Sequence, residues 1–267
     1  MTPIVFAVHC HPDDIEFTCA GTLFRLKDAG CELHYMTVAN GCVGSMTTGV
    51  EETARVRAEE SRAAAALLGA AYHESIANDL EVFYGTELIR RLLAVVREVG
   101  PDIMLVPSPQ DYMEDHMNTS RVAVTAAFCR GMPNYPSIPP VAPIQKDVVL
   151  YHAMPHGLRD ELRHSIVPDF YVDIGPAIDR KERMLAAYVT RFEESDTWIT
   201  ARSHLEEIES ADYVPQELLA RIRGAYETND EIHNSTSVPE RIDTLLKKHG
   251  YRGALIGALP DDDEIPF

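Results

Sequence analysis

Two short polar segments of the sequence carry residue types that bind metals and move protons. The first, residues 10–16 with sequence CHPDDIE, follows the apolar run 3–8. Neutral imidazole and carboxylate are good zinc ligands, and a catalytic zinc site keeps one coordination position open for water. His11 and Asp14 are three residues apart across a tight turn and can face one ion, which leaves Asp13 as a general base. Capping of the following helix by Asp13 or Asp14 is the simpler reading, and this motif alone leaves it open.

The second segment, residues 108–116 with sequence SPQDYMEDH, follows another apolar run, 102–107. His116 would complete a His/Asp/His ligand set from two strand ends, with water in the fourth position. Asp115 would orient a neighbouring ligand without contacting the metal itself. A solvated polar loop is the alternative for this segment taken alone. The occurrence of both segments at strand ends favours a metal site.

These two segments need a fold that brings them together, and the sequence alternates strand and helix patterns. Strands are predicted at 3–8, 32–39, 71–73, 102–107, 147–152 and 170–174. Helices are predicted at 15–30, 51–68, 87–99, 118–129, 178–190 and 203–226, and 131–143 is a Pro-rich loop. The alternation indicates an α/β protein with a parallel sheet and right-handed crossovers, in which ligands bind outside the carboxyl ends of the strands. We expect a single α/β domain over residues 1–267, with a motif-bearing core at about 3–175 and a helical elaboration at about 176–267.

Composition excludes several classes of partner. The net charge of −18 argues against nucleic acid, because binding to phosphates depends largely on Lys and Arg. No apolar run approaches the roughly 20 residues of a membrane span, and the N-terminus lacks the regions of a signal peptide. The five cysteines are odd in number and lack CxxC spacing, which is typical of thiols in a reducing cytoplasm. We therefore expect a cytoplasmic protein without a membrane span, and we leave its assembly into homo-oligomers open.

The two motifs resemble those of the PIG-L/LmbE-like family of zinc-dependent de-N-acetylases. That family carries an A-H-P-D-D-x-E-like motif after the first strand and an H-x-D-H-like motif after a later one. Here the first motif stands as CHPDDIE at 10–16, and the second keeps only its last two positions, Asp115 and His116. The resemblance covers residues 3–130 well. Further similarity lies at Ala20-Gly21-Thr22-Leu23, Arg57, Glu60, Leu68-Gly69 and Asn78-Asp79-Leu80.

The resemblance implies a Rossmann-like three-layer fold with a mainly parallel sheet and a C-terminal elaboration. It implies that His11, Asp14 and His116 bind zinc, that Asp13 is the general base, and that Arg57 and Asp79 contact the sugar part of a substrate. The implied activity is hydrolysis of an N-acetyl or other small N-acyl group from an amino-sugar-containing small molecule. The same ligand set also accepts iron(II) or cobalt.

Met113 departs from the family pattern. The family usually has a second histidine there, which stabilises the oxyanion or protonates the leaving amine, and a thioether can do neither. His152 and His156, near the end of the next strand, are candidates for the missing role by location, and with Asp115 they extend the candidate substrate-binding set.

Two other functions are weighed against hydrolysis. A sugar- or metal-binding relative that lost the chemistry is the first, and Met113 motivates it. A nucleotide-dependent oxidoreductase is disfavoured, because the first strand-to-helix turn lacks G-x-G-x-x-G and places acidic side chains where a pyrophosphate would bind.

Overall fold

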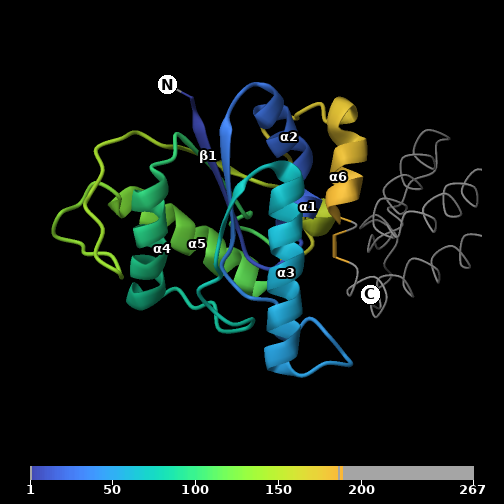
Figure 1. Ribbon diagram of the computed structural model, residues 1–267, viewed down its shortest axis with the longest axis horizontal. Helices are drawn as coiled ribbons and strands as arrows, with labels where there is room; N and C mark the ends of the chain where they lie inside the picture. The colour runs from blue at the N-terminus through green and yellow to red at the C-terminus, as the bar shows by residue number, and fades with distance from the viewer. Residues whose placement is uncertain (1, 186, 189–267) are drawn as a thin grey trace, which may run out of the picture. The chain divides into compact units, whose positions relative to one another are not determined.

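Five parallel strands form the sheet at the centre of the part of the chain that the structure describes (Figure 1). The computed structural model describes residues 2–185, 187 and 188. The strand order is β3-β2-β1-β4-β5, so that the first strand lies in the middle of the sheet. The strands are β1 (Ile4–His9), β2 (Glu32–Thr37), β3 (Ala71–His73), β4 (Ile103–Val106) and β5 (Val149–His152). The prediction of an α/β fold with a parallel sheet is confirmed.

Helices cover both faces of this sheet and make the fold three-layered (Figure 1). Helices α4 and α5 pack against each other on one face, and the remaining helices lie on the other, where α6 packs against α2 and α3. The helices are α1 (Asp14–Thr18), α2 (Ala20–Asp28), α3 (Val50–Leu68), α4 (Thr86–Val99), α5 (Glu114–Cys129) and α6 (Ile178–Leu185). None of these described helices is both long and apolar enough to cross a membrane.

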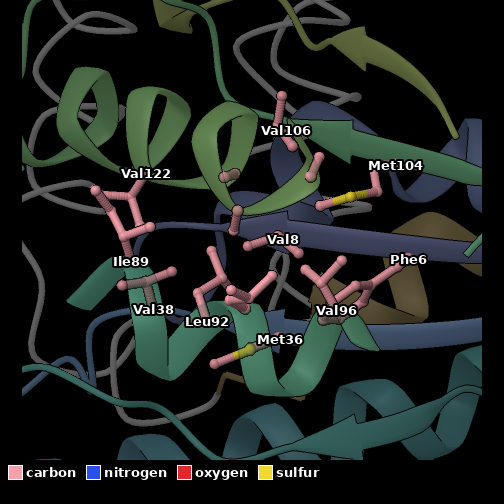
Figure 2. Close-up of a cluster of buried hydrophobic side chains, with 14 of the residues drawn as sticks. Phe6, Val8, Met36, Val38, Ile89, Leu92, Val96, Met104, Val106 and Val122 are labelled. Atoms are coloured by element: carbon pink, nitrogen blue, oxygen red, sulfur yellow. The ribbon is translucent and has the colours of Figure 1, made fainter. Parts of the chain in front are cut away.

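A buried apolar cluster fixes the sheet against α4 and α5 (Figure 2). Phe6 and Val8 of β1 meet Leu92 and Val96 of α4 in this cluster, and Val122 of α5 joins them. Burying each such side chain stabilises the fold by about 1.5–3 kcal/mol before the entropy cost of ordering it. Because β1 is packed on both faces, the point at which it ends is rigidly defined.

The observed elements differ from the predicted ones in three places. The helix predicted at 15–30 is two helices, which break at Cys19, where the backbone is not helical. Helix α5 begins at Glu114 and not near residue 118, so Asp115 and His116 lie in its first turn. The strand predicted at 170–174 is wrong: this apolar segment pairs with no described strand, and Phe170, Tyr171 and Val172 are exposed.

Two predictions concern the C-terminal part of the chain. Helix α6 covers residues 178–185 of the helix predicted at 178–190. The helices predicted at 203–226 lie outside the described residues, and the division into a core and a C-terminal elaboration stays a prediction.

Candidate metal centre

The fold brings the two polar segments to the same edge of the sheet. Strand β1 ends at His9 and leads through the first motif into α1, whereas β4 ends at Val106 and leads into α5. The two strands are parallel neighbours, with Ala7 opposite Leu105. Their carboxyl ends therefore lie side by side, as the strand pattern predicted.

Three side-chain atoms of the predicted ligands converge at this edge. Nδ1 of His11 lies 3.2 Å from Nε2 of His116 and 3.6 Å from Oδ2 of Asp14. The third side of the triangle, from Nε2 of His116 to Oδ2 of Asp14, measures 3.4 Å. Ligand atoms bound tetrahedrally to zinc at about 2.0–2.1 Å are separated by about 3.3–3.4 Å. The triangle therefore has the size that a single zinc ion requires.

The outer nitrogen of each imidazole is paired with a carboxylate. Nε2 of His11 lies 3.2 Å from Oδ2 of Asp115, and Nδ1 of His116 lies 3.1 Å from Oδ2 of Asp111. Each ring can thus donate its N–H outward and present a lone pair to the triangle. This carboxylate–histidine arrangement fixes the tautomer of metal-binding histidines and raises their basicity.

The carboxylates around the triangle favour positive charge there. Burial lowers the pKa of His11, but hydrogen bonds with Asp115 and Asp14 outweigh it and raise that pKa above its ordinary value. Burial likewise raises the pKa of Asp14, yet the nearby His116 and His11 hold it below its usual range. A metal cation and protons compete for such a site, because bound ligands must be deprotonated. The donor set therefore fits a divalent cation of the zinc type.

Cys10 stands beside the triangle, and its thiol, His11 and Asp14 are together close enough to hold an ion. Its Sγ atom, however, lies 3.6 Å from Nε2 of His11, the nitrogen that faces Asp115 and not the triangle. Burial raises the pKa of the Cys10 thiol to about 11, and a metal ligand must be the thiolate. His116 therefore makes the better third ligand.

Asp13, the candidate general base, is buried in an ion pair with Arg57. Nη2 of Arg57 donates to Oδ2 of Asp13 at 3.0 Å and to the carbonyl of Pro12 at 2.6 Å, and Nη1 donates to Glu60. Asp13 has a left-handed backbone with φ of 96°, an unfavourable conformation for a residue with a side chain. Asp13 precedes α1, but its side chain makes no hydrogen bond that caps this helix. The Asp14 carboxylate accepts a hydrogen bond from the backbone N–H of His11. The capping reading is therefore wrong for Asp13, and the Asp14 carboxylate is directed back to His11.

The two residues expected to contact a sugar have other partners in the structure. Arg57 is only 3% exposed, because its guanidinium faces Asp13 and Glu60. Asp79 accepts hydrogen bonds from the backbone N–H groups of Gly41 and Val43, at 2.7 and 3.1 Å. Gly41 has φ of 77°, and a side chain there would press against Arg57 and Pro12. Both residues thus hold together the loops that surround the first motif.

Of the two histidines proposed to replace the missing one, His156 shares an aromatic neighbour, Tyr112, with the proposed ligand His116. The Tyr112 ring packs edge-on against His116, with centroids 5.7 Å apart, and also against His156, at 6.4 Å. The ring of His152 is instead hydrogen-bonded to the Pro107 carbonyl at 2.7 Å. Met113 immediately precedes α5 and is half-buried.

Asp111 is the main residue of the site that sequence reasoning missed. It lies in the same strand-to-helix segment as His116, five residues upstream, so the available signal was a second carboxylate in the second motif. Its other oxygen accepts from the Met113 N–H at 3.1 Å, which holds the carboxylate in place against His116. Glu60 and Tyr188, which contact Arg57, were also not predicted to support the site.

Fold and donor set together define the class: a Rossmann-like α/β protein with a two-histidine, one-aspartate cluster at the carboxyl edge of its sheet. Residues 6–127 match the model of the PIG-L family, which is described as GlcNAc-PI de-N-acetylase. This match confirms the resemblance suggested by the two motifs, and it contains every residue of the proposed ligand set. His152 and His156 lie outside the matched range.

Three known proteins illustrate the similarity. A diacetylchitobiose deacetylase of Thermococcus kodakarensis is 27% identical over 201 residues, which is 73% of this chain and 72% of the relative. The structure of an N,N'-diacetylchitobiose deacetylase from Pyrococcus horikoshii aligns with a TM-score of 0.61 and 23% identity, covering 70% of each chain. GalB, a 4-carboxy-2-hydroxymuconate hydratase from Pseudomonas putida, aligns with a TM-score of 0.60 and 19% identity, over 80% of this chain and 91% of its own. Because this fold also supports a hydratase, fold alone does not define the reaction.

Proposed function

We propose that the protein is a metal-dependent N-deacetylase that removes an acetyl or other small acyl group from an amino-sugar-containing small molecule. The observation that carries the proposal is the triangle of His11, Asp14 and His116, with the buried Asp13 next to Asp14 in sequence. The deacetylase activity of the Thermococcus relative supports the same reaction class. The linear amide of an N-acetylated sugar is the bond such a site would cleave.

The side chains of this chain would divide the work as follows. His11, Asp14 and His116 would hold the cation, with zinc as our first choice and iron(II) or cobalt as alternatives. A bound zinc ion would acidify a water molecule and polarise the acyl carbonyl. Asp13 would accept the proton of the attacking water, and the ion pair with Arg57 would keep its carboxylate oriented.

The orienting carboxylates would preserve the geometry of the ligands. Asp115 and Asp111 would hold the two imidazoles so that each presents one lone pair inward. Asp115 also accepts the Leu80 N–H at 2.7 Å and so connects a third loop to the site.

A sugar- or metal-binding protein without catalysis is the competing function. Asp13 argues against it, because binding alone does not require a carboxylate that is neither a ligand nor a helix cap. The argument is testable, since both functions need the metal and only one needs Asp13.

The experiment is metal analysis of protein purified without added metal, followed by acetate release from N-acetylglucosamine and diacetylchitobiose with and without a chelator. His116→Ala should lose the metal, whereas Asp13→Asn should keep it and lower kcat by roughly 100-fold to 10,000-fold. Asp28→Asn changes an exposed aspartate that pairs with Arg180 and should behave like wild type. Stoichiometric metal in a fully active His116→Ala protein would refute the ligand assignment. Bound metal without acetate release from any N-acetylated sugar would favour the binding protein.

A further inference from the structure

Amide hydrolysis requires a proton for the departing amine as well as a base for the water. In the site described above, Asp13 takes the water proton, and the other aspartates around the triangle accept hydrogen bonds from histidines or from the backbone. The group that serves the amine should be a side chain able to donate a proton, close to the triangle and open to substrate.

Tyr112 and His156 form a continuous aromatic contact that starts at a proposed ligand. The Tyr112 ring meets the His116 ring at 80° and the His156 ring at 66°, so it is in edge contact with both imidazoles. Tyr112 is 62% exposed and His156 is also exposed. His156 is thus an accessible imidazole one aromatic ring away from the proposed metal ligand.

The backbone that carries His156 is held in an unusual conformation. Gly157 and Leu158, the next two residues, have φ of 74° and 56°, and a left-handed leucine costs of order 1 kcal/mol. The segment is fastened by its own hydrogen bonds: the Leu158 N–H donates to the Pro155 carbonyl, and the Ile166 N–H donates to the Leu158 carbonyl. Strained but well-connected backbone of this kind is often found where a side chain must be presented to a ligand.

His152 provides the comparison within the same region. Its Nδ1 atom lies within hydrogen-bonding distance of the Pro107 carbonyl and of the Ser120 hydroxyl, which is 3.3 Å away. These contacts hold the His152 ring against its own neighbours. Among the described residues, no aromatic contact connects His152 to His116, whereas Tyr112 contacts both His116 and His156.

We propose that His156, supported by Tyr112, donates the proton to the leaving amine; this inference depends on the proposed deacetylase function. As the carbon–nitrogen bond of the tetrahedral adduct breaks, its electron pair stays on nitrogen, which takes the proton of the His156 imidazolium. The imidazole then regains a proton from solvent, and Asp13 releases the water-derived proton to solvent. The acid that is released then loses its remaining hydroxyl proton to solvent. The products are therefore the carboxylate, the free amine and one proton, so atoms and charge balance.

The test compares amides that share the acetyl group but differ in the basicity of the amine: N-acetylglucosamine, acetanilide and p-nitroacetanilide. A weakly basic nitroaniline can leave without full protonation, whereas a sugar amine cannot. His156→Gln should lower kcat on N-acetylglucosamine by roughly 100-fold and on p-nitroacetanilide only a few-fold, with KM little changed. His152→Gln is the control and should leave the ratio of the two rates as in wild type.

Tyr112 gives a second, independent readout. Tyr112→Phe keeps the aromatic contact and should retain the wild-type rate ratio, whereas Tyr112→Ala should shift the ratio toward that of His156→Gln. Metal content and Tm of each variant should match wild type, which separates proton donation from damage to the metal site. Equal losses on all three amides, or no loss in His156→Gln, would overturn the assignment.

The outcomes separate this inference from the proposed function. Cleavage of the anilides without cleavage of any N-acetylated sugar would refute the sugar substrate. The ratio of the rates on acetanilide and p-nitroacetanilide would still test the role of His156. An enzyme that cleaves none of the amides refutes both proposals.

Discussion

The ion pair between Arg57 and Asp13 leads to a prediction that separates two roles for the arginine. Family resemblance implies that Arg57 contacts the sugar, which would make its loss mainly a loss of substrate affinity. In the structure the guanidinium is 3% exposed and holds Asp13 and Glu60, each at 3.0 Å. Its loss should therefore reduce stability and kcat more than it changes KM.

The size of the effect follows from burial. Removing one partner of a buried ion pair costs about 3–5 kcal/mol, because the remaining charge stays buried without compensation. In Arg57→Met two carboxylates would remain, and their mutual repulsion adds to this cost. For a domain of this size, about 2–4 °C in Tm per kcal/mol gives a drop of roughly 6–20 °C. Arg57→Lys restores the charge but not the planar two-nitrogen geometry and should recover part of the loss.

Thermal unfolding, metal content and steady-state kinetics of the three proteins would test this reasoning. Arg55→Met is the matched control, since Arg55 lies on the same helix and pairs with Glu52 and Glu59 at the surface. It should leave Tm and kcat unchanged, because exposed ion pairs contribute little. If Arg57→Met kept the wild-type Tm and kcat and only raised KM, the guanidinium would be a substrate contact and our assignment would be wrong.

Two further predictions concern the histidines. Asp111→Asn and Asp115→Asn should each weaken metal affinity by roughly 10-fold to 100-fold, because each substitution removes the carboxylate that orients one imidazole. The affinity is measured by competition with a chromogenic chelator. Unchanged affinity in both variants would contradict the proposed orientation. Burial and the neighbouring His34 lower the pKa of His73 to about 4. Between pH 6.5 and about 4 the folded state therefore binds fewer protons than the unfolded chain. The free energy of unfolding should fall as the pH decreases through that window. His73→Gln should therefore lose less Tm than wild type over that window, and an equal loss would show that other groups cause it.

The strands that position the site could be predicted because they are buried. Strand β1 is a continuous apolar run, as expected for a central parallel strand with a helix layer on each face. Its end was marked by Pro12, since proline cannot donate to the strand ladder. Strand β4 was predicted at 102–107 and ends at Val106. The alternation of strands and helices indicated a parallel sheet, in which the carboxyl ends of both strands lie at one edge. His11, Asp14 and His116 could therefore be grouped from the sequence.

Partners that depend on long-range packing could not be predicted in the same way. Arg57 is charged and lies on an Ala- and Glu-rich helix, a pattern that indicates a solvated face. Only the tertiary structure shows that its side chain faces Asp13, 44 residues away, under the Tyr188 ring. The segment 170–174 failed for the opposite reason: its residues favour strands, but strand formation needs a neighbouring edge, and composition does not reveal whether one is in reach.

Asp115 explains why the three loops at this edge must fold together. Its Oδ2 atom lies within hydrogen-bonding distance of both the His11 ring after β1 and the Leu80 N–H in the loop that follows β3, while Asp115 itself lies in the first turn of α5. Leu80 has a left-handed backbone with φ of 61°, which places its N–H toward the carboxylate at some cost in backbone energy. Next to it, Asp79 binds the backbone of the loop after β2, and that loop packs against Arg57 through Gly41. The orientation of His11 is thus coupled to loops from neighbouring strands, and a substitution in any of them should change metal affinity without touching a ligand.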